Sequence, residues 1–152
     1  MAQARTFVQY TTRRRGVPHP RSIRLWTQAA LRAERRRGGD LTVRFVGARE
    51  GRALNRRWRG RDYATNVLSF PGETGSGAVA WLGDIVLCVP VILAEARDQH
   101  KPANAHYAHM VVHGVLHLLG YEHRRATDAA LMERREISIL RSLGYPDPYG
   151  SG

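Results

Sequence analysis

The sequence has little of what marks secreted, disulfide-rich or membrane proteins. Its 152 residues contain a single cysteine, Cys88, which excludes an intrachain disulfide and a thiolate metal cluster. No apolar run approaches the ~20 residues that a membrane-spanning helix requires. Residues 1–10 also lack the apolar core of a signal peptide. We therefore expect one cytoplasmic domain over residues 1–152, without a membrane partner.

Lysine and acidic residues are scarce as well, and the arginines are unevenly distributed. Lys101 is the only lysine among 24 basic residues, and the net charge is +11. Residues 1–61 contain 17 arginines and three acidic residues, whereas residues 62–152 contain seven basic and ten acidic residues. A GC-rich genome explains arginine in place of lysine, but it does not explain this asymmetry. The first half thus predicts a surface that binds nucleic-acid phosphates, with an anionic membrane as the weaker alternative.

Three histidines form the strongest signal in the chain. His113, His117 and His123 are spaced as H-x3-H-x5-H, and Gly120 lies between the second and the third. Histidines four residues apart lie on one face of a helix, about 6 Å from each other, where both can bind one metal ion. A glycine can end the helix in the left-handed conformation and return the third imidazole to the same ion. Three protein ligands leave a fourth position for water, which is typical of a catalytic zinc site.

The alternative interpretation is a buried helix whose histidines are satisfied by hydrogen bonds. His106 and His109 extend the helical stripe, and we expect them to support the site or lie at the surface rather than bind metal. The array also fits the metzincin protease pattern H-E-x-x-H-x-x-G-x-x-H, except that Gly114 stands where these enzymes have the general-base glutamate. The sequence therefore predicts a zinc hydrolase that is not a standard metalloprotease.

Hydrophobic periodicity and turn residues divide the chain into nine elements. Strands are predicted at residues 6–10, 41–45, 65–71 and 81–89, and helices at residues 20–37, 48–58, 91–100, 102–119 and 127–143. Thr127 is the expected cap of the last helix, and residues 72–77 are expected to form a flexible loop. The order predicts an α+β domain, a mixed sheet of about four strands packed with about five helices. The metal site is expected at the end of a central helix.

Three separated stretches are similar to one family. Residues 113–123, His-Gly-Val-Leu-His-Leu-Leu-Gly-Tyr-Glu-His, closely resemble the signature of the YbeY family of bacterial rRNA maturation endoribonucleases. Residues 65–71, Thr-Asn-Val-Leu-Ser-Phe-Pro, and residues 82–85, Leu-Gly-Asp-Ile, resemble two strands of that family. The resemblance is strongest over residues 40–149, and Glu122 departs from it where the family more often has aspartate.

The resemblance implies a metal-dependent endoribonuclease specific for single-stranded RNA. Its implied roles are maturation of the 3′ end of small-subunit rRNA, ribosome biogenesis and ribosome quality control. It implies one Zn²⁺ ion per chain on His113, His117 and His123, and catalytic roles for His113 and for Arg59, which lies where the family has its functional arginine. The implied partners are single-stranded RNA, small-subunit rRNA, the small ribosomal subunit and a ribosome-associated GTPase, and no DNA is expected.

Arg59 suits a phosphate clamp, because its planar guanidinium donates two parallel hydrogen bonds and keeps its charge. The alternative is one solvated arginine among several. The general base stays open between Asp84, Glu122 and His109, and a substrate 2′-hydroxyl is an alternative nucleophile. Asp84 interrupts an apolar strand, and a buried carboxylate needs a partner or a function. Two other functions stay open: a ribosome-assembly factor that binds RNA and has a mainly structural zinc site, and a zinc peptidase, against which Gly114 argues.

Overall fold

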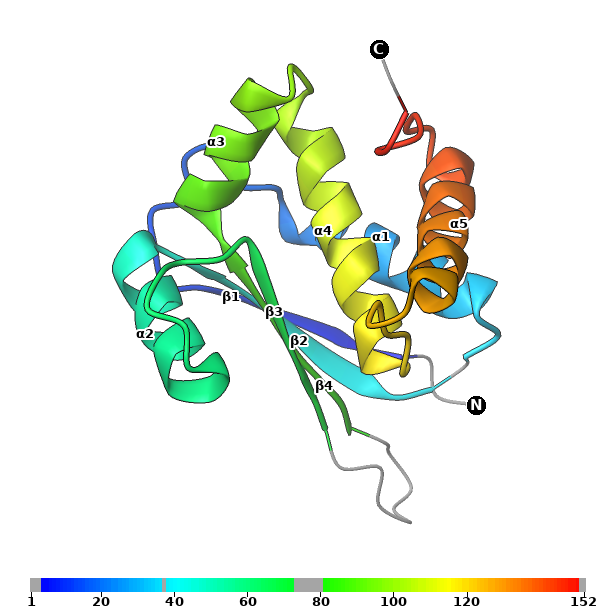
Figure 1. Ribbon diagram of the computed structural model, residues 1–152, viewed down its shortest axis with the longest axis horizontal. Coiled ribbons are helices and arrows are strands. Elements are labelled where there is room, and N and C mark those ends of the chain that lie inside the picture. Colours follow the sequence, from blue (N-terminus) through cyan, green and yellow to red (C-terminus); the bar gives the residue numbers. More distant parts are fainter. Residues whose placement is uncertain (1–3, 37, 73–80, 151–152) are drawn as a thin grey trace.

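The computed structural model describes residues 4–36, 38–72 and 81–150, and its elements follow the predicted order (Figure 1). The strands are β1 (Thr6–Tyr10), β2 (Asp40–Val46), β3 (Val67–Pro71) and β4 (Trp81–Cys88). The helices are α1 (Pro20–Ala33), α2 (Ala48–Arg59), α3 (Val89–Asp98), α4 (Ala103–Leu118) and α5 (Ala126–Ser142). Within the described ranges, no helix is both long enough and apolar enough to cross a membrane.

The four strands form one mixed sheet in the order β1-β2-β4-β3. β2 is parallel to both β1 and β4, whereas β3 is antiparallel to β4 and lies at the edge. A parallel pair needs a crossover connection, and α1 supplies it between β1 and β2. A four-stranded mixed sheet with five helices confirms the predicted α+β class.

Successive side chains of a strand point to opposite faces, so the sheet has two unlike faces. On the first face, Leu41 and Phe45 of β2 are fully buried in the main hydrophobic core with residues of α1, α4 and α5. On the second face, Val46 and Cys88 form a smaller buried cluster under α2. Figure 1 shows α2 on one side of the sheet and α1, α4 and α5 on the other.

α4 is the central helix, as its apolar sequence predicted. Ten of its 16 residues are buried, and it packs against α1, α3, α5 and the strands β3 and β4. Burial of each large apolar side chain contributes about 1.5–3 kcal/mol, so this helix is firmly held in the core. Its C-terminal half carries the first two histidines of the array, which are partly buried, between core residues such as Val115 and Leu116.

Three local predictions differ from the structure or fall outside it. α1 ends at Ala33 instead of continuing to residue 37, because Arg35 has a left-handed φ of 57° that ends a right-handed helix. Residue 37 itself lies outside the described residues, as does the predicted loop beyond Gly72. The prediction that Thr127 caps the last helix is wrong: α5 begins at Ala126, and Arg125 occupies the cap position without a side-chain hydrogen bond.

Candidate metal centre

Three histidine side chains converge at the C-terminal end of α4. The ring centroids of His113 and His117 lie 4.5 Å apart, and the ring centroid of His123 lies 4.9 Å from that of His117 and 5.8 Å from that of His113. One nitrogen from each ring lies within 4.8 Å of the other two. The H-x3-H-x5-H spacing therefore corresponds to a three-histidine group that could bind a metal ion.

The turn after α4 returns His123 toward the helix. The N–H of Gly120 donates to the carbonyl oxygen of His117, and the N–H of Tyr121 donates to that of Leu116, at 3.0 Å each. This pair of bonds is a Schellman ending, which closes a helix and reverses the chain. Gly120 has a φ of 102°, a conformation in which any other residue would be strained. The role predicted for this glycine is confirmed.

His117 is oriented by the same turn. Its Nδ1 donates to the carbonyl oxygen of Tyr121 at 2.8 Å, so Nε2 keeps a free lone pair. Burial lowers the pKa of His117, and the neighbouring rings of His113 and His123 lower that pKa further. A neutral ring with a free Nε2 is the form of histidine that binds a metal ion.

His113 is oriented by a carboxylate that the sequence did not reveal. Glu136 of α5 is fully buried, and its Oε1 lies 3.3 Å from Nδ1 of His113 and 2.8 Å from Nε2 of His109. Tyr149 donates its hydroxyl to the same oxygen at 2.7 Å. Burial alone raises the pKa of Glu136, but the hydrogen bonds from His109 and His113 outweigh burial and lower this pKa to about 2. The ionised carboxylate thus holds the proton on Nδ1 of His113 and leaves Nε2 as the ligand atom.

The donor atoms fit a metal ion. Nε2 of His113 and Nε2 of His117 lie 3.1 Å apart, and both keep their lone pairs because the two Nδ1 atoms carry the protons. Two lone pairs that face each other at this distance repel, and a cation bound between them would remove the repulsion. Two nitrogens bound at 2.0–2.1 Å to one tetrahedral zinc ion lie roughly 3.3 Å apart, close to the observed separation. Neutral imidazoles suit zinc and other divalent transition metals.

His106 and His109 are buried on α4, and each contacts a carboxylate. Nε2 of His106 lies 2.8 Å from Glu95 of α3, and Nε2 of His109 lies 2.8 Å from Glu136. A second group of possible ligands, His109, His113 and Glu136, shares His113 with the three-histidine group. We favour the three-histidine group, because the carboxylate of Glu136 already accepts hydrogen bonds from three side chains.

The turn that carries His123 is anchored by a second carboxylate. Tyr121 donates its hydroxyl to Oε1 of Glu34, which caps the end of α1, at 2.5 Å. Arg135 of α5 donates through Nε to Oε2 of the same residue at 2.8 Å. Because the carbonyl oxygen of Tyr121 orients His117, this anchor acts on a ligand through the backbone. Glu34 lies 87 residues before Tyr121, so no local spacing could have identified it.

Arg59 is the last residue of α2 and lies against the edge strand β3. Its Nη2 donates to the carbonyl oxygen of Ser69 at 2.8 Å, and its guanidinium carbon lies 5.4 Å from the ring centroid of Phe70. The Ser69 hydroxyl in turn lies 3.4 Å from the carbonyl oxygen of Gly114, the residue after His113. Ser69 therefore connects the arginine that the sequence singled out to the helix that carries the histidines.

The candidate general bases occupy different places. Asp84 lines a hollow on the second face of the sheet together with Arg59, whereas Ile85 beside it faces α4. Burial raises the pKa of Asp84, although a hydrogen bond from Thr42 opposes the rise. Glu122 is exposed next to His123. The structure thus places Asp84 with the arginine and not with the histidines.

The position of the protease glutamate is closed. A Cβ atom at Gly114 would lie 2.9 Å from Cγ2 of Ile85 and 3.0 Å from its Cδ1, which is closer than real Cβ atoms approach. Any side chain at this position would start toward the sheet, and either Ile85 or α4 would have to shift to make room for it. The packing of α4 on β4 therefore disfavours a glutamate at residue 114.

An α+β domain with three histidines converging at the end of its central helix defines a class of candidate metal-binding proteins without the protease carboxylate. Sequence comparison narrows this class. Residues 10–144 match the profile of the family described as "YbeY: Endoribonuclease YbeY". The chain belongs to the YbeY family, as the resemblance of its motifs predicted.

Individual relatives agree with the profile. Endoribonuclease YbeY of Stenotrophomonas maltophilia (strain K279a) is 50% identical over 147 residues, which cover 93% of this chain and 91% of that protein. Endoribonuclease YbeY of Cupriavidus necator is 52% identical over 138 residues, which cover 90% of this chain and 67% of that protein. The solution structure of a Thermotoga maritima protein matches with a TM-score of 0.61 at 20% identity, over 96% of this chain and 99% of that one. This last likeness supports the fold alone.

Proposed function

We propose that this protein is a zinc-dependent endoribonuclease that cleaves single-stranded RNA. The observation that carries the proposal is the convergence of His113, His117 and His123 in a chain that belongs to a family of endoribonucleases. Relatives about half identical over most of the chain are named for this activity. The 17 arginines of residues 1–61 supply the positive charge that an RNA substrate requires.

Family membership also supports a specific cellular role. We propose that the substrate is the 3′ region of small-subunit rRNA, and that the enzyme acts in ribosome biogenesis and quality control. The small ribosomal subunit and a ribosome-associated GTPase are the proposed partners. The single cysteine, Cys88, is buried and free, which suits work in a reducing cytoplasm.

The side chains around the metal centre divide the work of the reaction. A zinc ion on the three histidines would polarise a phosphoryl oxygen and lower the pKa of a bound water. Glu136 and the Tyr121 carbonyl hold protons on Nδ1 of His113 and His117, which keeps both Nε2 atoms directed at the ion. Arg59, fixed against β3, can donate two hydrogen bonds to the phosphate and stabilise the charge that develops on it.

Two other functions make different predictions. An assembly factor with a structural zinc site would bind RNA and lose its fold without metal, but it would not cleave. A zinc peptidase would need a general base near the metal, and the contact between Gly114 and Ile85 closes the position that proteases use.

The test combines cleavage and metal content. Wild type should carry one zinc per chain and cleave single-stranded RNA, whereas His117→Ala should lose both the metal and the activity. His100→Asn is the matched control, because His100 is exposed outside the cluster and its φ of 53° is one that asparagine tolerates. Equal metal in wild type and His117→Ala, or RNA left intact by metal-loaded wild type, would overturn the proposal.

A further inference from the structure

The second face of the sheet carries a row of side chains that the metal centre does not use. Strand register places one residue from each strand opposite the next, in the order Phe7, Thr42, Asp84 and Phe70. The neighbouring row consists of Gln9, Arg44, Val86 and Leu68. α2 packs over Val86 and Leu68. The first row begins at Phe7, which is 44% exposed.

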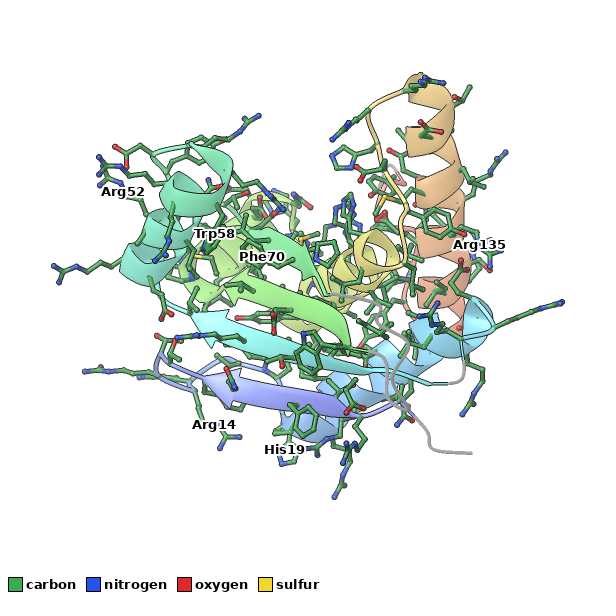
Figure 2. All side chains as sticks on the ribbon, turned by 90° about the horizontal axis from the view of Figure 1, so that it is seen from below. Arg14, His19, Arg52, Trp58, Phe70 and Arg135 are labelled. Atoms are coloured by element: carbon green, nitrogen blue, oxygen red, sulfur yellow. The ribbon has the colours of Figure 1, made fainter. Side chains whose placement is uncertain are left out.

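Aromatic rings stand at both ends of this row, and each ring is paired with an arginine. The guanidinium carbon of Arg5 lies 5.5 Å from the ring centroid of Phe7, and that of Arg59 lies 5.4 Å from the ring centroid of Phe70. Trp58 of α2 packs edge-on against Phe70 with 6.1 Å between the ring centroids, and it is 56% exposed. Figure 2 shows the two residues beside each other. Phe7 and Trp58 are exposed, whereas Phe70 is partly buried. Accessible aromatic rings next to cations are what single-stranded nucleic-acid sites use for stacking and phosphate binding.

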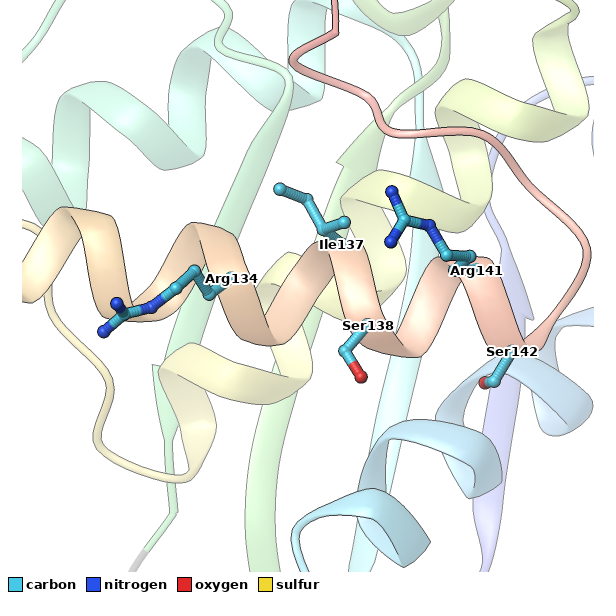
Figure 3. Close-up of a pocket in the computed structure, with 5 residues that line it drawn as sticks. All are labelled: Arg134, Ile137, Ser138, Arg141 and Ser142. Atoms are coloured by element: carbon cyan, nitrogen blue, oxygen red, sulfur yellow. The ribbon is translucent and has the colours of Figure 1, made fainter.

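A hollow of about 560 Å³ lies along the row, lined by Gln9, Thr42, Arg44, Leu54, Trp58, Arg59, Phe70, Pro71, Asp84 and Val86. It combines aromatic, cationic and hydrogen-bonding groups that come from five elements of the chain. The hollow on the outer side of α5 is different, because among the described residues its lining comes from one helix and contains no aromatic side chain (Figure 3). The sheet-face hollow therefore has the varied chemistry that a nucleotide requires.

The centre of the row is polar and spaced to admit a base. Adjacent strands lie about 4.8 Å apart, so the backbones beneath Phe7 and Phe70 are separated by about 14 Å. Asp84 lies between them, and Thr42 is its partner in the strand register. A carboxylate accepts hydrogen bonds from a base edge. Guanine suits it best, because its N1–H and N2–H donors are adjacent, whereas the single N3–H of uracil lies between two carbonyl oxygens.

We propose that the row from Phe7 to Phe70 is a platform for single-stranded RNA, with bases stacked on the two phenylalanines and a guanine read by Asp84. Arg5 and Arg59 bind the phosphates next to the stacked bases. The platform rests on the proposed function, since RNA is the substrate. Arg59 hydrogen-bonds Ser69 of the edge strand β3, and the Ser69 hydroxyl contacts α4, so this strand separates the platform from the helix that carries two of the histidines.

The test measures the affinity of full-length protein for a labelled single-stranded oligonucleotide with one guanine. Phe7→Ala should weaken binding about 5- to 150-fold, which is the range for losing one base–aromatic stack, and Phe7→Tyr should restore it. Leu131→Ala is the matched control, because Leu131 is also 44% exposed but lies on α5, on the other side of the sheet. A second oligonucleotide carries uracil in place of the one guanine. Wild type should bind the guanine form more tightly, and Asp84→Asn should lose this preference.

The outcomes distinguish a failure of the platform from a failure of the proposed function. If wild type cleaves RNA but Phe7→Ala and Leu131→Ala both bind like wild type, the platform is refuted and the endoribonuclease stands. The same result is expected if this face binds a protein instead. If wild type binds RNA without cleaving it and Phe7→Ala loses the binding, the platform stands and the proposed function fails. If wild type does not bind single-stranded RNA at all, both fail.

Discussion

The two faces of the sheet hold their functional side chains in opposite ways. On the α4 side, Nδ1 of His113 is hydrogen-bonded to the fully buried Glu136, and Nδ1 of His117 is hydrogen-bonded to the carbonyl oxygen of Tyr121. On the other face, Phe7 and Trp58 are about half exposed. A metal site needs its ligands fixed to within about 0.5 Å, whereas stacking and phosphate binding tolerate adjustment. The first face should therefore control metal and rate, and the second should control RNA affinity.

Arg59 lines the hollow of the second face and hydrogen-bonds β3, the strand whose Ser69 contacts α4, and its removal should have the largest effect of these predictions. Arg59→Ala should lower the single-turnover cleavage rate by about 100-fold or more, the scale for one preorganised donor to a transition state. Arg59→Lys should also be impaired, because it keeps the charge but loses the planar fork. Metal content and thermal stability should match wild type, and so should the cleavage rate at saturating RNA of Arg56→Ala, an exposed arginine on the same helix. If the metal content and the cleavage rate of Arg59→Ala fell together, the role of Arg59 would be structural.

Glu136 tests whether the histidines on the α4 side of the sheet depend on their buried hydrogen-bond partner. Glu136→Gln should weaken zinc binding by about 10- to 100-fold, the usual cost of losing a hydrogen-bond partner of a metal ligand. The folded state should also lose about 3 kcal/mol, because His109, His113 and Tyr149 lose their shared ionised acceptor. Zinc titration and chemical denaturation measure the two effects. Glu133→Gln, on an exposed position of the same helix, should change neither; a wild-type zinc affinity in Glu136→Gln would remove Glu136 from the site.

A smaller effect is expected where the support is indirect. Tyr121→Phe removes the hydroxyl bond to Glu34 but keeps the carbonyl that orients His117. We expect zinc affinity to fall several-fold and the free energy of unfolding to fall by about 1 kcal/mol, the usual contribution of one hydrogen bond. Tyr63→Phe is the control, since Tyr63 is exposed and lies near α2. If Tyr121→Phe binds zinc like wild type, the turn is held by its backbone alone.

The smallest effect is expected at the exposed arginines beyond β1. Replacing Arg13, Arg14 and Arg15 by alanine should weaken RNA binding and flatten its salt dependence, by a slope of up to about 0.7 for each phosphate that the triplet neutralises in wild type. All three are exposed, and Arg14 lies over the ring of Tyr10 at 4.3 Å. Binding measured across a salt series gives the slope directly. An unchanged slope would show that this triplet does not bind phosphate.

The histidine cluster was predictable because its determinants are local. The four-residue spacing of His113 and His117 and the left-handed glycine at residue 120 both act within about one turn of the helix end. The order of strands and helices also followed from periodicity within short windows. These features need no knowledge of how distant elements pack.

The supporting groups could not be found in this way. Glu136 and Glu34 reach the histidines and their turn only because α5 and the end of α1 pack beside α4. The row on the second face depends on the antiparallel return of β3, which brings Phe70 opposite Asp84. Periodicity showed that Asp84 was out of place in an apolar strand, but only the register showed which residues surround it.

The close approach of Gly114 to Ile85 also limits how this protein can evolve. A single exchange of Gly114 for glutamate would create a clash, because the new Cβ atom would lie 2.9 Å from Cγ2 of Ile85, so that Ile85 or α4 would have to shift. If α4 shifted, the two histidines that it carries would move with it. A second exchange that shortens Ile85 would relieve the clash, but that change alone would leave a cavity in the core. The glutamate of the protease pattern is therefore more easily reached by two coordinated exchanges than by one, although the histidine spacing is the same.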